Sequence, residues 1–377
     1  MTHSRGQKPN VIFVQPAVPA YRRAFFEAIY ETLGPRLKVY ASSPDMGALT
    51  QGSKQYDWLT PLSDLKDFGP LTWQRGALSI AFSRNDIVVL PVGPRTVSNI
   101  FLLIKAKLSG AKIIGWGHFW SSTSCQYRAN IRYVLMKTPD ALLFYTDEEI
   151  ELYQAKFKTS RKPVFALNNG IDIKPITQHR AQYAAKARKT DMLFIGRLTV
   201  KTELDILINA MALPEMARFT LSVIGDGEYG EAYKSLAQKL NVDKRITWHK
   251  GTTDEVEIAK IANDCKVFVY PGGVGLSLIH SLAYGLPAVV HDDRWKHMPE
   301  IAALEADVSG VTFEYQQAHS LVATLAGLLN DPQKLNTLSE GAIATTRDDY
   351  NTDSMAARFL DMLEHDAFSS QHIATEA

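Results

Sequence analysis

The stretch from Cys265 to Asp293 constrains the fold more than any other part of the chain. An apolar, β-branched run, Val267 to Tyr270, meets a Pro-Gly-Gly breaker, and an apolar segment of helical character, Leu276 to Tyr284, ends at Gly285 and Pro287. This order of signals predicts a strand, a loop, a helix and a second strand.

The glycines of this loop suit it to an anion. Gly272, Gly273 and Gly275 let the backbone approach a ligand without interference from a Cβ atom, and the helix that follows offers unpaired N–H groups and the positive end of its dipole. A loop of this kind binds phosphates. Any tight turn before a buried helix also recruits glycines, so the loop alone leaves both interpretations open.

The same alternation of strands and helices runs through the chain in two series. In the first, strands are expected at residues 10–17, 37–41, 86–92, 111–116, 141–145 and 163–167. In the second, they are expected at residues 191–195, 219–224, 245–249, 265–270, 287–291 and 311–315. Such alternation predicts two doubly wound α/β domains with parallel sheets, whose shared ligand site would lie at the strands' carboxyl ends, in a cleft between the domains.

We expect an N-terminal domain at residues 1–175 and a C-terminal domain at residues 176–345, joined by a polar, charged linker at residues 173–190. Residues 346–377 are expected to form a C-terminal helix and a tail, which could pack back on the N-terminal domain. Residues 42–83 are rich in Gly, Pro, Asp and aromatic side chains, and are expected to form an irregular loop that holds a ligand.

Composition narrows the class of protein. Of the 377 residues, 46% are hydrophobic and 21% charged, as in a globular protein with enough apolar material for two cores. No apolar run is long enough for a membrane span, and residues 1–10 lack the apolar region of a signal peptide. Cys125 and Cys265 are the only cysteines, which excludes a disulfide framework. A cytoplasmic location is expected.

Charge is unevenly distributed. Residues 1–180 hold 23 Lys and Arg against 13 Asp and Glu, whereas residues 181–377 hold 18 against 27. A basic N-terminal half suits an anionic partner such as a membrane surface, although solvated surface charge is the alternative. An early helix with Tyr21, Arg22 and Arg23 beside Phe25 and Phe26 is compatible with peripheral membrane contact, and equally with burial of its aromatic side chains.

Cations follow the first strand of the second series. Gly196 and Arg197 end that strand and Lys201 lies four residues further on, so a guanidinium and an ammonium could hold a diphosphate at the edge that carries the glycine-rich loop. Three anion-binding features at one edge arise by chance less often than one. Gly225 follows the next strand, and Gly251 and Thr252 follow the strand after it. These residues are expected first to form turns, and they could also line the site. 

In the first series, Gly-Trp-Gly-His ends a central strand at His118. This histidine could act as a base or donate to a sugar hydroxyl, or be a polar residue satisfied by its surroundings. Arg95, after an earlier strand, is a weaker candidate for the same site. The first turn lacks a G-x-G-x-x-G fingerprint, which argues against a dinucleotide-binding oxidoreductase. Asp292 and Asp293 have no third ligand in sight, so no metal site is expected.

Taken together, these stretches resemble a known family. The order FIGRL, LSVIGDGE, ITWHKG, VFVYPGGVGLSLIHSLAYGLPAVV and PEIAALEADVSGVTF is similar to the C-terminal half of retaining GT-B glycosyltransferases of family 4, the glycosyl transferases group 1. LNNGIDI is similar to the family's Asn-Gly-Val-Asp junction. The resemblance implies two Rossmann-like domains facing each other across a cleft, a nucleotide diphosphate sugar as co-substrate, no further cofactor, and no metal.

Residue roles implied by the resemblance follow by position. Arg197 and Lys201 would hold the donor diphosphate and neutralise the leaving group, and His118 would face the reacting sugar. The resemblance also places donor binding at the second domain and acceptor binding at the first. The full donor-binding set is Arg197, Lys201, Gly225, Gly251, Thr252, Gly273, Gly275, Leu276, Ser277 and His280; the acceptor-binding set is Tyr21, Arg22 and Arg95.

Three departures from the family pattern stand out. The two glutamates of the family's E-x7-E segment are replaced by Gly272 and His280, of which only His280 could still bind ribose hydroxyls. The spacing from Arg197 to Lys201 is one residue shorter than usual, and Thr202 stands where a glycine is usual. The first turn also lacks the usual Gly-Gly pair.

The leading hypothesis is therefore a glycosyltransferase that moves a hexosyl-type sugar to a glycan or lipid-linked glycan with retention of configuration, on the inner face of the cell membrane. No nucleic-acid partner is expected. The alternatives are a non-catalytic GT-B protein that binds a glycan or supports a partner glycosyltransferase, and a nucleotide-sugar epimerase.

Overall fold

The computed structural model describes residues 9–43, 56–120 and 126–368 of the chain. It divides into two compact units: unit 1 comprises Met1–Asn168 with Thr352–Ala377, and unit 2 comprises Asn169–Asn351. The division thus falls a few residues before the expected boundary, and the last helix lies in the first unit. Cys125 lies outside the described residues.

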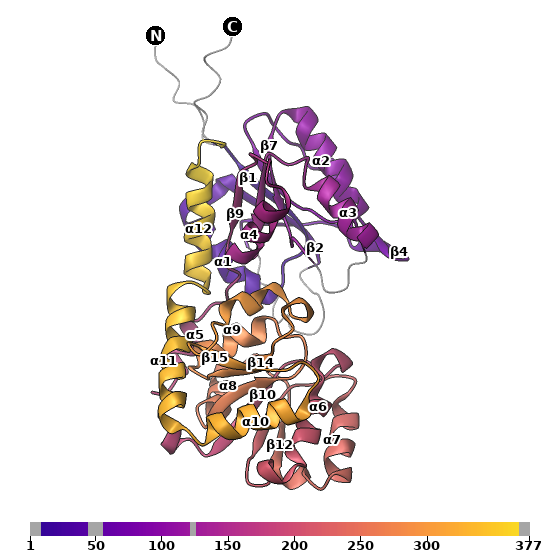
Figure 1. Cartoon of the computed structure of the whole chain (residues 1–377). Coiled ribbons are helices and arrows are strands. Elements are labelled where there is room, and N and C mark those ends of the chain that lie inside the picture. The colour runs from indigo at the N-terminus through magenta and orange to yellow at the C-terminus, as the bar shows by residue number, and fades with distance from the viewer. Residues whose placement is uncertain (1–8, 44–55, 121–125, 369–377) are drawn as a thin grey trace, which may run out of the picture. The chain divides into compact units, whose positions relative to one another are not determined.

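Unit 1 is built on a parallel sheet of seven strands in the order β3-β2-β1-β6-β7-β8-β9. Figure 1 labels four of these strands, β1, β2, β7 and β9. The strands are β1 (Val11–Ala17), β2 (Leu37–Ser43), β3 (Leu59–Pro61), β6 (Ile87–Pro91), β7 (Lys112–Trp116), β8 (Ala141–Phe144) and β9 (Val164–Ala166). The helices are α1 (Ala20–Leu33), α2 (Val97–Ser109), α3 (Gln126–Leu135), α4 (Asp147–Lys156) and α12 (Thr352–Glu364). The strand order reverses between β1 and β6, where a doubly wound sheet holds its ligands.

The alternation of side chains along β1 explains why both faces of this sheet are covered. Phe13 points into a cluster with residues of α1 and α12, and its ring centroid lies 5.1 Å from that of Phe26 and 5.2 Å from that of Phe359. Ile12 and Val14 point the other way, into a cluster with residues of α2. Strands buried on both faces read as continuous apolar runs, which is why the sequence predicted them.

The segment expected to be an irregular loop, residues 42–83, contains more regular structure than the sequence suggested. Residues 44–55 lie outside the described part; beyond them, β3 pairs with β2, and β4 (Leu65–Phe68) and β5 (Leu71–Gln74) form a hairpin around Gly69 and Pro70. These strands have few buried side chains and little apolar alternation, so sequence periodicity did not reveal them.

Unit 2 has a parallel sheet of six strands in the order β12-β11-β10-β13-β14-β15. The strands are β10 (Thr190–Ile195), β11 (Leu221–Ile224), β12 (Ile246–His249), β13 (Cys265–Tyr270), β14 (Ala288–His291) and β15 (Gly310–Phe313). The helices are α5 (Lys174–His179), α6 (Leu204–Met211), α7 (Gly230–Lys239), α8 (Glu255–Ala262), α9 (Leu276–Ala283), α10 (Ala318–Leu329) and α11 (Pro332–Asp348). In this sheet the order reverses between β10 and β13.

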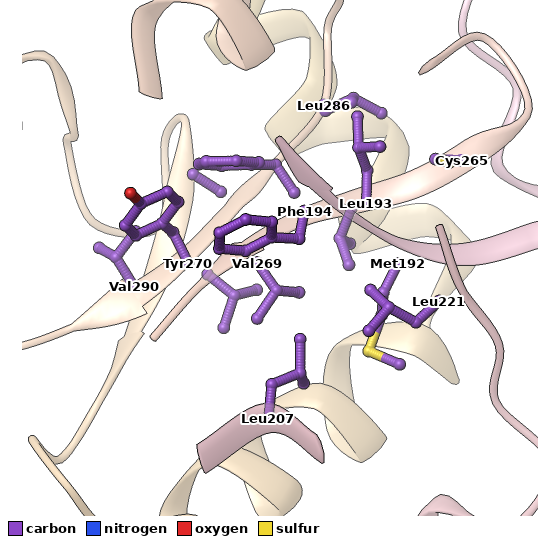
Figure 2. Close-up of a cluster of buried hydrophobic side chains, with 14 of the residues drawn as sticks. Met192, Leu193, Phe194, Leu207, Leu221, Cys265, Val269, Tyr270, Leu286 and Val290 are labelled. Atoms are coloured by element: carbon purple, nitrogen blue, oxygen red, sulfur yellow. The ribbon is translucent and has the colours of Figure 1, made fainter. Parts of the chain in front are cut away.

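The core of unit 2 surrounds these two central strands (Figure 2). Met192 and Phe194 of β10 are fully buried, and Phe194 stacks on Tyr270 of β13 with ring centroids 4.9 Å apart. Leu207 of α6 covers the same cluster from one face of the sheet. The tight packing fixes where the two strands end, and the residues that follow them are the candidate site.

Two segments that the sequence analysis expected to be a linker and a tail contain ordered structure. The expected linker at residues 173–190 contains the helix α5 and a short 3-10 helix, Ala185–Ala187. At the C-terminal end, Phe368, in the segment expected to form a helix and a tail, is 6% exposed and belongs to the core cluster of unit 1 with Phe359 of α12. No helix in the described ranges is long and apolar enough to cross a membrane.

Candidate functional site

The loops after β10 and β13 meet at the point where the strand order of unit 2 reverses. The N–H of Gly272 donates a hydrogen bond to the carbonyl of Thr202 over 3.0 Å. The side-chain oxygen of Ser277, in the first turn of α9, lies 3.6 Å from the position that a Cβ on Gly196 would occupy. The structure therefore brings the residues around Arg197 and the start of α9 together.

Gly272, which stands where the family resemblance led us to expect a glutamate, is packed closely against backbone. A Cβ at this position would lie 2.3 Å from the carbonyl oxygen of Lys201 and 2.7 Å from the carbonyl carbon of Thr202, so no side chain fits without moving the backbone. A Cβ on Gly273 would lie 2.6 Å from the carbonyl oxygen of Lys296. Backbone therefore confines the loop on two sides, and glycine is the residue that permits this approach.

Arg197 and Lys201 are exposed cations without partners. Neither side chain makes an ion pair or a hydrogen bond with any residue of the described part of the chain. Beside them, α9 begins without a side-chain cap or an acidic residue in its first turn, so the amides of Leu276 and Ser277 keep their donors for a ligand. Two unpaired cations and a free helix N-terminus favour an anion at this edge.

His280 does not offer a free imidazole to a ligand. Its Nε2 lies 2.9 Å from Oε1 of Glu255, and the hydroxyl of Tyr284 donates to the other carboxylate oxygen over 2.7 Å. Burial raises the pKa of Glu255, but the hydrogen bonds from His280 and Tyr284 and the charge of His280 outweigh it, so the net pKa is lowered. Sequence reasoning missed Glu255, because no motif links the start of α8 to α9.

The other predicted donor-side residues lie mostly in turns. Gly225, directly after β11, packs against Gly196: a Cβ on Gly225 would lie 1.9 Å from the carbonyl oxygen of Gly196. Gly225 also lines a cavity of about 280 Å³. The N–H of Gly251 donates to the carboxylate of Asp226 over 2.9 Å, and the hydroxyl of Thr252 accepts from the N–H of Asp254. For Gly251 and Thr252 these bonds are the turn chemistry expected from the sequence.

A pair of stacked histidines supports the glycine-rich loop. His291 and His297 stack with ring centroids 3.8 Å apart, and both are 1% exposed. Nδ1 of His297 accepts from the N–H of Val274, while its Nε2 donates to the carbonyl of His291 over 2.9 Å. Burial is the main cause that lowers the pKa of each histidine to about 4, so both are neutral at pH 7.

Unit 1 carries a cavity of about 420 Å³ at the reversal between β1 and β6. Tyr21, Arg22 and Arg95, the residues predicted to bind an acceptor, all line it, together with Trp116 at the end of β7 and Tyr145 after β8. The structure thus brings residues from four separate stretches of the sequence together in one pocket. Phe25 and Phe26 are each 1% exposed, so their predicted membrane contact is wrong and the alternative of core packing is confirmed.

His118 lies next to this cavity, stacked on Tyr145 with ring centroids 4.0 Å apart. Its Nδ1 is 3.9 Å from the carboxylate of Glu149, too far for a hydrogen bond, and has no partner among the described residues. Burial lowers the pKa of His118 to about 3, with smaller contributions from the charges of Arg132 and Arg22. A neutral imidazole at pH 7 can donate or accept one hydrogen bond with a sugar hydroxyl.

Glu149 is a second residue that sequence reasoning missed. It is fully buried and accepts from the N–H of Phe119 over 2.7 Å and from the N–H of Tyr145 over 2.9 Å. These bonds join the segment after β7, which carries His118, to the segment after β8. A Glu in the first turn of a helix is a common partner of the helix dipole, so nothing in the sequence marked Glu149 as a buried acceptor.

The paired aspartates after β14 act as loop residues. Asp293 accepts from the N–H of Trp295 and caps a short 3-10 helix, and Asp292 accepts from the N–H of Tyr315 over 3.0 Å. Within the described ranges, no group of three or more His, Cys, Asp or Glu side chains is arranged to hold a metal ion.

Two Rossmann-like units in series define the GT-B class of fold, as the sequence predicted, and comparisons with known proteins agree. Residues 175–345 match the model of the family glycosyl transferases group 1, so this part of the chain is a domain of that family. An uncharacterized glycosyltransferase of Haemophilus influenzae is 26% identical over 209 residues, a match that covers 54% of this chain and 55% of the relative. The chain therefore spans about half the length of this relative.

Solved structures share the fold over nearly the whole chain. Sucrose-phosphate synthase from Thermosynechococcus elongatus has a TM-score of 0.69 at 14% identity, covering 94% of this chain and 98% of the other. HepE of Anabaena, in complex with UDP, has a TM-score of 0.67 at 14% identity, covering 94% of this chain and 99% of the other.

The low pKa of His297, which supports the glycine-rich loop, predicts how the stability of the protein depends on pH. Because its folded pKa is below its ordinary value of 6.5, the unfolded chain binds more protons between pH 6.5 and 4, and stability falls as the pH drops through this window. His297→Asn keeps an acceptor for the Val274 N–H but does not titrate. Denaturant unfolding should show a loss between pH 7 and 4 that is smaller than in the wild type by on the order of 3 kcal/mol.

His319→Asn is the matched control, because His319 is exposed on α10. It shows the effect of replacing a histidine by asparagine away from the glycine-rich loop. If His297→Asn shows the wild-type loss of stability between pH 7 and 4, the assignment of a neutral His297 in the folded state is wrong.

Proposed function

We propose that the protein is a glycosyltransferase that moves a sugar from a nucleotide diphosphate sugar to a glycan or lipid-linked glycan, in polysaccharide or glycoconjugate biosynthesis. The observation that carries this proposal is the pair of unpartnered cations, Arg197 and Lys201, beside the uncapped start of α9. The domain of glycosyl transferases group 1 at residues 175–345 supports it. In this proposal unit 2 binds the donor and unit 1 binds the acceptor.

Chemically, the two cations would act on the leaving group. Charge builds up on the diphosphate as its bond to the sugar breaks, and fixed positive groups stabilise that charge more than they stabilise the ground state. Arg197 can hold two phosphate oxygens with its fork of donors, and Lys201 adds a compact charge. Backbone donors near Gly273, Gly275 and Leu276 would complete the site, so the proposal needs no metal ion for this step.

The proposed stereochemical outcome is retention, and His118 would face the reacting sugar. A neutral His118 that stacks on Tyr145 suits a hydrogen bond to a hydroxyl better than it suits proton abstraction, because its low pKa makes it a weak base. This role is positional. The main acceleration is assigned to leaving-group stabilisation by the cations of unit 2.

Gly272 favours a second candidate function. Since no side chain fits at this position, no carboxylate can reach the sugar from here. A non-catalytic protein that binds a nucleotide sugar or a glycan is therefore the alternative. Analysis of products separates the two: transfer or slow hydrolysis of the donor supports the enzyme, and unchanged donor with bound nucleotide supports the binding protein.

Removal of either cation should weaken nucleotide binding. We expect Arg197→Ala and Lys201→Ala each to raise the Kd for the preferred nucleoside diphosphate by about tenfold or more, since a charge-assisted hydrogen bond contributes roughly 1.5–3 kcal/mol. Calorimetric titration after a thermal-shift screen of nucleoside diphosphates and nucleotide sugars measures this.

Lys244→Ala is the control for these variants, because Lys244 is also an exposed cation of unit 2 but precedes β12, at the amino end of the strands. Its Kd should match that of the wild type. Equal affinity of all three variants for the nucleotide would contradict the proposed donor site.

We also propose peripheral contact with an anionic membrane at the cytoplasmic face, through a different surface from the one the sequence suggested. Phe101, Ile104 and Leu108 lie on one face of α2 and are 48%, 52% and 84% exposed. The hairpin of β4 and β5 adds exposed Phe68 and Leu71. Trp73 of β5 packs on Phe101 with ring centroids 5.7 Å apart, so hairpin and helix form one surface.

These apolar side chains are flanked by three basic residues, Lys66 on β4, Arg75 after β5 and Lys105 on α2. Apolar side chains bordered by cations are the combination that binds an anionic lipid interface. Replacing Phe101, Ile104 and Leu108 with Ser should abolish sedimentation with vesicles that contain anionic lipid and leave the unfolding temperature nearly unchanged. The same three changes would have no effect on vesicle binding if the membrane lies elsewhere or is not a partner.

A further inference from the structure

Arg22 is a buried guanidinium without an acidic partner. It is 6% exposed, yet its Nη1 has no hydrogen-bond partner, and among the residues that the structure describes no carboxylate lies within ion-pair distance of it. An uncompensated charge inside a protein is costly unless something pairs with it. A ligand that carries a negative charge would therefore supply the partner that Arg22 lacks.

Aromatic rings hold the guanidinium in place. Its central carbon lies 4.8 Å from the ring centroid of Trp116, 5.3 Å from that of Tyr145 and 5.4 Å from that of Tyr21. Ring faces attract a cation and set its orientation, but they accept no strong hydrogen bond. The rings thus orient the guanidinium and leave its N–H donors unused.

The unused donors share one cavity. Arg22, Trp116 and Gln15 all line the 420 Å³ cavity of unit 1. The indole Nε1 of Trp116 and Nε2 of Gln15 are also buried and have no hydrogen-bond partner within the described ranges. An indole N–H and a guanidinium can only donate, so the group that satisfies them has to accept from several donors.

The charged side chains around the cavity also favour a negatively charged ligand that accepts hydrogen bonds. Arg95 lines the same cavity, is exposed, and makes no side-chain ion pair or hydrogen bond within the described ranges. Among the described residues, Asp67 is the one carboxylate that lines the cavity, and it is exposed to solvent. Two arginines against a solvated aspartate leave a positive site, and arginine's fork matches a carboxylate or a phosphate.

We propose that this cavity binds the acceptor by an oxyanion, a carboxylate or a phosphate, whose oxygens accept from Arg22 and Trp116 while Arg95 contacts it from the rim. The acceptor is then an acidic glycan or a glycan phosphate rather than a neutral one. This inference rests on the proposed function in assigning the ligand of unit 1 as the acceptor. Oxyanion binding itself requires neither a donor nor transfer.

Arg22→Gln removes the charge and keeps a polar, though shorter, side chain. Since it takes away an unpaired buried charge, we expect the unfolding temperature of the unliganded protein to stay the same or rise. Arg23→Gln is the matched control, because Arg23 is the next residue of α1, is half-buried and does not line the cavity. Saturation-transfer NMR and quenching of tryptophan fluorescence measure binding of methyl glucuronide, glucose 1-phosphate and methyl glucoside.

We expect one or both anionic probes to bind at least tenfold more tightly than methyl glucoside, and this preference to disappear in Arg22→Gln but not in Arg23→Gln. Binding of the glucuronide alone would identify a carboxylate, and of the sugar phosphate alone a phosphate; either supports the proposal. It is overturned if methyl glucoside binds as tightly as both anions, or if Arg22→Gln keeps the preference.

Nucleotide binding in the same Arg22→Gln preparation separates this inference from the proposed function. Arg22 and the donor site lie in different units, so the Kd for the nucleoside diphosphate should equal that of the wild type. Loss of anion preference with intact nucleotide binding tests unit 1 alone, whereas wild-type protein that binds no nucleotide would contradict the proposed function and leave the anion result standing.

Discussion

The site in unit 2 depends on the close approach of two pieces of backbone. The loop after β13 touches the loop after β10 at Gly272, and a single Cβ there would collide with Lys201 and Thr202. The same loop is held from the other side by His297, whose neutral ring accepts from Val274. This confinement sets the start of α9 beside Arg197. The preorganised donors that follow from it are what an oxyanion needs.

Unpartnered arginines occur in both units, but in opposite surroundings. Arg197 is exposed at the end of a strand, where water solvates it until a ligand arrives. Arg22 is buried among aromatic rings, and its Nη1 has no hydrogen-bond partner in the part of the chain that the structure describes. In the proposed function, Arg197 would stabilise the charge that develops on a departing diphosphate. In the further proposal, Arg22 would bind a fixed anion of the acceptor, so the two proposals give catalysis and specificity to different arginines.

Sequence predicted the sheets well because parallel strands buried on both faces, such as β10 and β13, leave continuous apolar runs. The sequence also indicates that Arg22 is buried, although we did not predict this. Spacings of three and four residues place Arg22 on the same helical stripe as Phe25, Phe26 and Ile29, all of which are buried. The bond between His280 and Glu255 left no such signal, because their contact depends on how α8 and α9 pack. The collision at Gly272 likewise involves backbone from two distant loops.

The most direct test of the donor site is a titration of protein labelled with ¹⁵N only at glycine, using the nucleoside diphosphate that binds best. Its amide spectrum reports each glycine separately. The resonances of Gly273 and Gly275 should shift on binding, while those of Gly34 and Gly110, in turns of unit 1, should not. Unchanged Gly273 and Gly275 resonances at saturating nucleotide would show that the anion binds elsewhere, and would contradict the central claim.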